Sequence, residues 1–343
     1  MPPTTRSQTN PELSLTSLED CQIKFIGEGA ANLVFAITPP PNSPLTSIFN
    51  GYLLRVPKAE TKTHDYPSLQ SYWETTICPL FPSSNLVQQR LIRLSSPSSI
   101  TAKLNTALGT VESTRRPDFQ GTCVLSSAEY GMLVEDMRSV SGGDLSLEFK
   151  PKWLSPSPSA PPSSLRCRNC AREALRNSLH PSHHKSHHAK IPCPLDLLHC
   201  SHSSASLSNM MSYISPPPPL NTVSKLDALT AWLQSNTLLP QLRQAQIAHD
   251  KTGPLGEGIN GEELQLAMTL RDCSCFLRIP SDYPRQPVEA KLADLDKKNW
   301  EKKLSYWQGL ERELIEGGYY EAKEEPRQVT DCWLERQAKS LKD

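Results

Sequence analysis

Residues 268–306 read MTLRDCSCFLRIPSDYPRQPVEAKLADLDKKNWEKKLSY. This pattern predicts a strand over 274–279, a loop broken by three prolines, a second strand over 288–293 and then a helix. Asp272 enters the first strand and Asp294 leaves the second, so the strand pair holds two carboxylates at fixed places. Such a pair can provide a catalytic base and a metal ligand.

The helix that follows carries a cationic face. Lys298, Lys302 and Tyr306 are spaced i, i+4 and i+8, which predicts that they project from one side. A cationic face beside a metal-binding carboxylate suggests a polyanionic substrate. The opposite, apolar stripe would be buried and consists of Trp300, Leu304, Trp307 and Leu314.

The composition sets wider bounds. The 343 residues suffice for two lobes, and the formal net charge of zero does not favour long-range attraction to nucleic acid or a membrane. Residues 1–20 resemble a disordered arm. The sequence contains no run of 18 apolar residues, so we expect neither a signal peptide nor membrane insertion. We therefore expect an intracellular protein, in the nucleus or cytoplasm, whose ten cysteines are reduced thiols or metal ligands.

A glycine turn occurs in the first predicted hairpin, CQIKFIGEGAANLVFAI at residues 21–37. Glycines let a backbone approach a phosphate closely, although an ordinary hairpin turn explains the pattern too. The absence of a following helix pattern argues against a Rossmann turn or a P-loop. The next strand carries Arg55 where kinases place a phosphate-binding cation, with a solvated strand residue as the alternative.

Two further segments contain polar groups at regular positions. The strands in GTCVLSSAEYGMLVEDM (residues 121–137) end near Asp136, where a kinase-like hinge would hold adenine. In SGGDLSLEFKPKW (residues 141–153), alternation predicts that Glu148, Lys150 and Lys152 share one strand face. Three polar groups on one face favour a functional strand. Downstream, apolar residues at helical spacing over 226–248 predict two helices separated at Pro240.

Six motifs together resemble the inositol-pentakisphosphate 2-kinase family, and most closely its filamentous-fungal branch. They are GEGxAN, LLRVPK, EFKPKW, PLDL at residues 194–197, LRDCS at 270–274 and ADLDxK at 293–298. Their order and spacing match the family over about residues 22–320, and EFKPK and RDCS are specific to it.

The resemblance implies a two-lobe α+β fold of the protein-kinase-like or inositol phosphate kinase type. A small β-rich N-lobe would span 21–140, and a larger mixed C-lobe would span 141–343 with a flexible insert at about 155–220. ATP would bind between the lobes of a monomer and phosphorylate the 2-hydroxyl of inositol 1,3,4,5,6-pentakisphosphate, giving the hexakisphosphate.

The resemblance also implies residue roles. Asp272 would be the base, and Asp294 would bind Mg²⁺ with Asp272 as a second candidate ligand. Glu148 would hold the ribose. Nucleotide contacts would come from Gly27, Glu28, Gly29, Ala30, Ala31, Asn32, Arg55, Asp136 and Lys150, and inositide contacts from Lys152, Arg166, Lys298, Lys302, Tyr306 and a clamp arginine, for which Arg116 fits best and Arg115 is the alternative.

The segment LRCRNCAREALR departs from the family pattern, because Cys170 stands where a histidine is expected. Arg168, Arg172 and Arg176 then become surrogate phosphate contacts. Structural zinc on Cys167, Cys170, Cys193 and Cys200 is the less favoured interpretation, since the spacing is irregular. A solvated His-rich loop with buried thiols is favoured. A catalytically inactive inositide-binding pseudokinase and a zinc-stabilised binding module stay open as alternatives. The sequence contains no HRD or DFG motif, which argues against a protein kinase.

Overall fold

The computed structural model describes residues 13–61, 64–138, 143–179, 193–199 and 223–341. They form a mixed α+β structure with one six-stranded and one three-stranded sheet. The chain divides into two compact units: unit 1 is Met1–Glu74 with Val87–Asp136, and unit 2 is Thr75–Leu86 with Met137–Asp343. Residues 75–86 therefore group with unit 2, whereas the sequence had placed them in the first lobe.

Unit 1 is built on the six-stranded sheet, in the order β1-β5-β6-β4-β3-β2. The hairpin of β2 and β3 surrounds the glycine turn, and alternation buries Leu33 and Phe35 completely. Leu15 and Leu18 are also buried, which corrects the predicted arm, because the packed chain begins before residue 21. The strands are β1 (Ser14–Leu15), β2 (Gln22–Glu28), β3 (Asn32–Thr38), β4 (Tyr52–Pro57), β5 (Gln89–Leu94) and β6 (Tyr130–Glu135).

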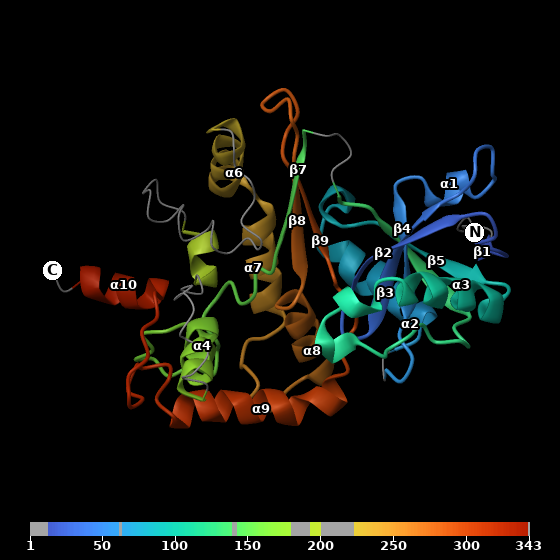
Figure 1. Ribbon diagram of the computed structural model, residues 1–343. Helices are drawn as coiled ribbons and strands as arrows, with labels where there is room; N and C mark the ends of the chain where they lie inside the picture. Colours follow the sequence, from blue (N-terminus) through green and yellow to red (C-terminus); the bar gives the residue numbers. More distant parts are fainter. Residues whose placement is uncertain (1–12, 62–63, 139–142, 180–192, 200–222, 342–343) are drawn as a thin grey trace, which may run out of the picture. The chain divides into compact units, whose positions relative to one another are not determined.

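Two helices pack on opposite faces of this sheet (Figure 1). Met132 and Leu133 are neighbours in β6 and therefore point to opposite sides. Leu133 joins the core with helix α3, and Met132 packs with helix α2. The helical segments of unit 1 are α1 (Thr46–Phe49), α2 (Tyr66–Tyr72), α3 (Pro97–Gly109), η4 (Glu112–Thr114) and η5 (Pro117–Phe119); η1 (Trp73–Ile77) crosses the boundary between the units.

The three-stranded sheet of unit 2 is antiparallel, in the order β7-β8-β9. Strand β8 (Ser274–Ile279) has the predicted bounds, and β9 (Glu289–Ala293) begins one residue later than predicted. Strand β7 spans Leu145–Phe149. Ser274 pairs with Ala293, so the start of β8 and the end of β9 lie at the same end of the sheet.

Helices form most of the rest of unit 2, with α8 packed against both α7 and α9 (Figure 1). Trp307 is buried with Trp153 and Leu264, as the apolar stripe predicted. The first part of the predicted flexible insert contains an ordered helix, α4. The helical segments are η2 (Cys78–Leu80), η3 (Ser83–Asn85), α4 (Arg168–Leu179), η7 (Pro194–Leu197), α6 (Val223–Ser235), α7 (Leu238–Ala248), α8 (Gly261–Leu270), α9 (Trp300–Glu316) and α10 (Trp333–Ser340).

Two helix boundaries differ from the prediction. Helix α9 begins at Trp300 because the Asn299 side chain caps it by accepting a hydrogen bond from the Lys302 amide, so Lys298 precedes the helix. The break before α7 lies ahead of Leu238, and Pro240 belongs to the first turn, where a missing N–H costs little.

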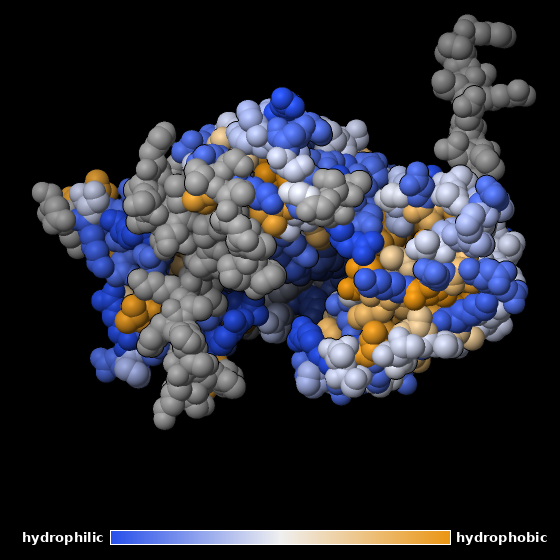
Figure 2. Space-filling view, turned by 45° about the horizontal axis from the view of Figure 1, so that its top comes forward, coloured by the Kyte–Doolittle hydropathy of each residue, from blue (hydrophilic) through white to orange (hydrophobic). Residues whose placement is uncertain are grey.

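The visible surface is hydrophilic over much of unit 2, whereas hydrophobic residues cover a larger share of the visible face of unit 1 (Figure 2). Among the described residues, no helix combines the length and the apolar character needed to cross a bilayer.

Candidate active site

Two carboxylates and three lysines meet at the end of the β8–β9 pair in unit 2. Asp272 accepts hydrogen bonds from Lys152 Nζ at 3.0 Å and from Lys298 Nζ at 2.9 Å. Lys150 Nζ donates to Asp294 Oδ2 and to the main-chain oxygen of Asp272, both at 2.8 Å. The five side chains, which we call the carboxylate–lysine cluster, are between 28% and 48% exposed. A ligand can therefore reach them.

The lysines of this cluster do not lie on a strand face, which corrects the sequence-based prediction. Strand β7 ends at Phe149 because Pro151 cannot donate to the ladder. Lys152 then adopts a φ of +57°, and Asp294 a φ of +56°. This left-handed conformation is uncommon for residues other than glycine, and residues that adopt it are found disproportionately at functional sites.

Gln246 of α7, which sequence reasoning missed, joins the two segments that carry Lys152 and Asp272. Its side chain is completely buried. Nε2 donates to the carbonyl oxygens of Lys152 at 2.9 Å and Leu270 at 3.2 Å, and Oε1 accepts from the Leu154 amide at 3.0 Å. The amide group thus fixes the spacing of two backbone segments that are distant in sequence. Helix α7 contains three glutamines, at 241, 244 and 246, and nothing in their spacing distinguishes Gln246 from the other two.

The lysines determine the ionisation of Asp272. Burial would raise its pKa, but Lys298, Lys152 and Lys150 outweigh that effect and hold the pKa well below the usual value. Burial likewise opposes the charge of Lys150, while Asp294 and Asp272 raise its pKa. Asp272 is therefore ionised and Lys150 keeps its charge near neutral pH, within a cluster of three lysines and two carboxylates.

The other predicted site residues near this cluster are Glu148 on β7 and Lys302 and Tyr306 on α9. Glu148 lies on β7 and accepts a hydrogen bond from Ser274 Oγ at 2.8 Å, beside the start of β8. Lys302 and Tyr306 are exposed on α9, and Tyr306 is 54% exposed. Only Lys298 of the predicted helical triplet contacts Asp272 directly.

The glycine turn of unit 1 is held by several hydrogen bonds. The Gly29 amide donates to the Asn32 carbonyl at 3.0 Å, and the Lys58 amide donates to the Ala31 carbonyl at 2.9 Å. Tyr66 Oη donates to Asn32 Oδ1 at 2.9 Å. A Cβ atom added at Gly27 or Gly29 would meet no protein atom within 4 Å, so the protein itself does not require these glycines. Close approach of a ligand would explain them.

The candidate cations of unit 1 have distinct environments. Arg55 is buried in β4 with its guanidinium 5.4 Å from the Tyr66 ring. Arg115 is buried against Glu28 of the glycine turn, whereas the side chain of Arg116 is 70% exposed. Asp136 is the last residue of unit 1 and its amide donates to the Gly51 carbonyl at 2.9 Å.

Arg166 is not placed to bind substrate, which corrects its predicted role. It is buried and pairs with Glu324 at 2.8 Å. The same guanidinium donates to the carbonyl oxygens of Tyr319 and Gln328 and to Thr330 Oγ1. Of the surrogate contacts, Arg168 is buried against Glu311, and Arg176 is exposed beside Glu173. Arg166 holds the C-terminal segment in place.

Four buried cysteines converge in unit 2: Cys167, Cys170, Cys193 and Cys332. Their sulfur atoms lie within 4.8 Å of one another. The separation is 3.6 Å from Cys167 to Cys193 and 3.7 Å from Cys193 to Cys332, too long for a disulfide. Cys332 was not among the predicted ligands, and the predicted Cys200 lies outside the described residues. No local spacing links Cys332 to the other three; an isolated cysteine in a charged tail was the only signal.

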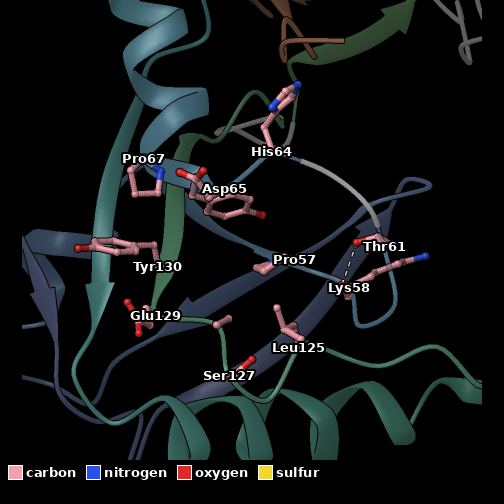
Figure 3. A pocket seen from close by; sticks show the side chains of 12 residues that line it. Pro57, Lys58, Thr61, His64, Asp65, Pro67, Leu125, Ser127, Glu129 and Tyr130 are labelled. Carbon is pink, nitrogen blue, oxygen red and sulfur yellow. Dashed lines mark hydrogen bonds between the residues drawn. The ribbon is translucent and has the colours of Figure 1, made fainter. Parts of the chain in front are cut away.

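Unit 1 also contains a pocket of about 480 Å³ beside the start of α2 (Figure 3). Asp65, Glu129 and Tyr130 contribute polar groups to its wall. Asp65 caps α2, and the hydrogen bonds from the backbone and side chain of Ser68 lower its pKa. The described residues that line this pocket include none of the predicted site residues.

On the α+β scaffold of unit 2, the half-exposed cluster offers both carboxylate and ammonium groups to a ligand. A family model described as inositol-pentakisphosphate 2-kinase matches residues 25–313, and the chain belongs to this family. A protein of Yarrowia lipolytica (strain CLIB 122 / E 150) named inositol-pentakisphosphate 2-kinase is 30% identical over 191 residues. That match covers 55% of this chain and 56% of the relative.

Proposed function

We propose that this protein transfers the γ-phosphoryl group of ATP to the 2-hydroxyl of inositol 1,3,4,5,6-pentakisphosphate. The products would be inositol hexakisphosphate and ADP. The carboxylate–lysine cluster carries the proposal, because it combines a proton acceptor with an excess of positive charge. Membership of the family supplies the identity of the acceptor and the position of the hydroxyl.

Asp272 would accept the proton of the attacking hydroxyl while the bond between the γ-phosphorus and the ADP oxygen breaks. Its low pKa makes it a weak base while the lysines surround it. Substrate phosphates that engage Lys152 and Lys298 would withdraw positive charge from Asp272 and raise its pKa. Substrate binding would thereby turn Asp272 into a stronger proton acceptor.

Mg²⁺ fits the donor set of the same cluster, because the carboxylate oxygens of Asp294 and Asp272 are the hard ligands it prefers. Asp294 would hold the ion, with Asp272 as a second ligand. When bound, Mg²⁺ would neutralise charge on the nucleotide phosphates.

An inositol pentakisphosphate carries roughly ten negative charges, at about two for each phosphate. Lys152 and Lys298 in the cluster, with Lys302 and Tyr306 on α9, would bind these phosphates in unit 2. Arg116, which is exposed in unit 1, stays the predicted clamp arginine. In unit 1 the open glycine turn would bind the ATP phosphates through its backbone, as part of a proposed kinase-like two-lobe fold. A monomeric state and residence in the nucleus or cytoplasm stay predictions.

A turnover assay with ATP, Mg²⁺ and inositol 1,3,4,5,6-pentakisphosphate tests this function, with the products separated chromatographically. We expect conversion to the hexakisphosphate by the wild-type protein and a loss of at least 10²-fold in Asp272→Asn. Inositide binding, measured by calorimetry, should persist in the variant. Undiminished turnover in Asp272→Asn would remove Asp272 from its role, and tight binding without turnover in the wild type would support an inactive binding protein. The latter alternative is not favoured, since both carboxylates are in place.

We also infer that the four-cysteine cluster holds a structural zinc ion. Tetrahedral zinc with sulfur ligands at about 2.3 Å requires sulfur separations of about 3.8 Å. The distances of 3.6 Å and 3.7 Å agree with this geometry, and the amide of Cys167 donates to the sulfur of Cys332 at 3.1 Å. When bound, zinc would attach the C-terminal segment to α4 and to the turn at Pro194.

Metal analysis of the purified protein should find one zinc per chain. Cys332→Ala should lose it, whereas Cys275→Ala, at an equally buried thiol outside the cluster, should retain it. A disulfide detected by mass spectrometry, or iron in place of zinc, would contradict the assignment.

A further inference from the structure

A second charged cluster lies behind the glycine turn and is built from Glu28, Lys58, Glu112 and Arg115. We call it the turn-anchor cluster. Glu28 receives Arg115 Nε at 2.8 Å and Nη2 at 2.7 Å, and Lys58 Nζ lies 2.6 Å from the same carboxylate. The side chains of Glu28, Lys58 and Arg115 are 7%, 1% and 1% exposed. This cluster is therefore largely closed to solvent.

Every N–H of the Arg115 guanidinium has an acceptor. Besides the two bonds to Glu28, Nη1 donates to Glu112 at 2.6 Å and to the Thr122 carbonyl at 2.9 Å, and Nη2 donates to Thr122 Oγ1 at 2.7 Å. A guanidinium has five such donors. Arg115 thus has no donor left for a substrate phosphate.

Arg116, its neighbour in sequence, is arranged in the opposite way. Its side chain is 70% exposed and contacts Asp118 at 3.1 Å, and Asp118 is 75% exposed. The guanidinium also lies 4.7 Å from the Phe119 ring. An exposed pair of this kind contributes little stability and is easily exchanged for a stronger anion.

The turn-anchor cluster is linked to the glycine turn through both backbone and side chains. Glu28 ends β2 directly before the exposed residues Gly29 and Ala30. Lys58 contributes its side chain to Glu28 and its amide to the Ala31 carbonyl. Displacing Glu28 would therefore release one end of the turn and weaken the contact at the other.

We propose that Arg115 is a positioning residue that fixes the glycine turn through Glu28, which leaves Arg116 for the clamp role that the family resemblance implies. The proposal rests on the function given above, in which the turn binds nucleotide phosphates. A pre-ordered turn would bind ATP without first losing backbone freedom. The two adjacent arginines would then have separate functions, one in nucleotide affinity and one in inositide affinity.

The matched variants Arg115→Lys and Arg116→Lys test this proposal, because each keeps the charge and removes the planar fork. Amide hydrogen exchange would follow peptides containing Gly29 and Lys58, whose amides donate to the turn. Calorimetry would follow the binding of Mg·ATP without inositide, and then of inositide alone. Circular dichroism would establish that each variant folds.

Arg115→Lys should increase exchange at both amides and weaken Mg·ATP binding on the order of tenfold, with inositide binding retained. Arg116→Lys should leave exchange and Mg·ATP binding unchanged and weaken inositide binding. Glu112 lies at the partly exposed edge of the cluster, so Glu112→Gln should also increase amide exchange and weaken Mg·ATP binding, but by less than Arg115→Lys. It serves as the test variant if Arg115→Lys does not fold.

A folded Arg115→Lys protein with wild-type exchange and Mg·ATP affinity but weakened inositide binding would overturn the proposal. If the wild-type protein binds no Mg·ATP, the proposed function fails, and unchanged exchange in Arg115→Lys would separately refute the anchoring role.

Discussion

The carboxylate–lysine cluster and the turn-anchor cluster both pair carboxylates with basic side chains, but in different settings. The first has three cations for two anions and side chains that are 28% to 48% exposed. In the second, two cations face two carboxylates, and the central Glu28, Lys58 and Arg115 are nearly inaccessible. Excess charge with access to solvent suits a ligand site, whereas balanced and buried charge suits a support.

The same change of carboxylate to amide should lower the free energy of unfolding by different amounts in the two clusters. Glu28→Gln leaves Lys58 buried without its carboxylate partner and Arg115 paired with Glu112 alone, and should lower the free energy of unfolding by about 3 kcal/mol. Asp294→Asn removes a half-exposed partner of Lys150 and should lower it by less than about 1 kcal/mol. Urea denaturation of both variants measures the difference, and equal losses would show that burial does not distinguish the clusters.

Measuring the free energy of unfolding at low pH provides a control for the Glu28→Gln prediction. Burial opposes ionisation of Glu28, but the hydrogen bonds from Arg115 and Lys58 lower its pKa overall. A lowered pKa in the folded state gives stability that is complete above the unfolded value of about 4.3 and is lost as pH falls through the folded value. The difference between wild type and Glu28→Gln should therefore shrink below about pH 4.

A substitution of Gln246 should give the next largest effect, a loss of kcat, because its buried side chain holds the backbone segments that carry Lys152 and Asp272. Gln246→Met keeps the volume but leaves the Leu154 amide and two carbonyl oxygens buried without their partner. The displaced Lys152 and Asp272 should lower kcat on the order of tenfold or more, with the KM for ATP unchanged. The comparison needs steady-state kinetics on a folded variant.

Gln241→Met is the matched control for that variant. Gln241 lies on the same helix and donates one hydrogen bond to the Leu80 carbonyl at 2.8 Å, away from the cluster. It should retain wild-type kcat. A wild-type kcat in Gln246→Met would mean that the β8–β9 pairing alone positions the carboxylates.

The sequence predicted the parts of this site that depend on local pattern. Alternation around Leu277 and the flanking prolines defined the β8–β9 pair, and with it the positions of Asp272 and Asp294. The glycine turn likewise followed from its two apolar flanks. These features can be predicted because side-chain period and proline or glycine positions act within a few residues.

The remaining parts depend on contacts between distant residues. Arg115 and Glu28 are 87 positions apart, and nothing in the doublet Arg115–Arg116 tells which arginine is buried. Cys332 joins cysteines more than 130 residues away in the chain. The left-handed Lys152 is set by tertiary contacts such as that of Gln246 with its carbonyl. Residue spacing cannot encode such pairings, so only the folded chain identified them.

The smallest expected effect concerns the pH dependence of the exposed cluster. Lys298 is the leading cause that lowers the pKa of Asp272, against the effect of burial. Lys298→Met should therefore raise that pKa, so that protonation disables the base at higher pH. The acid limb of the kcat/KM profile should move to higher pH than in wild type, and titration of the substrate phosphates cancels between the two proteins.

Lys302→Met removes a lysine of α9 that does not contact Asp272. This variant should weaken inositide binding without moving the acid limb. An acid limb at the same pH in Lys298→Met and wild type would show that a group other than Asp272 limits the reaction in acid.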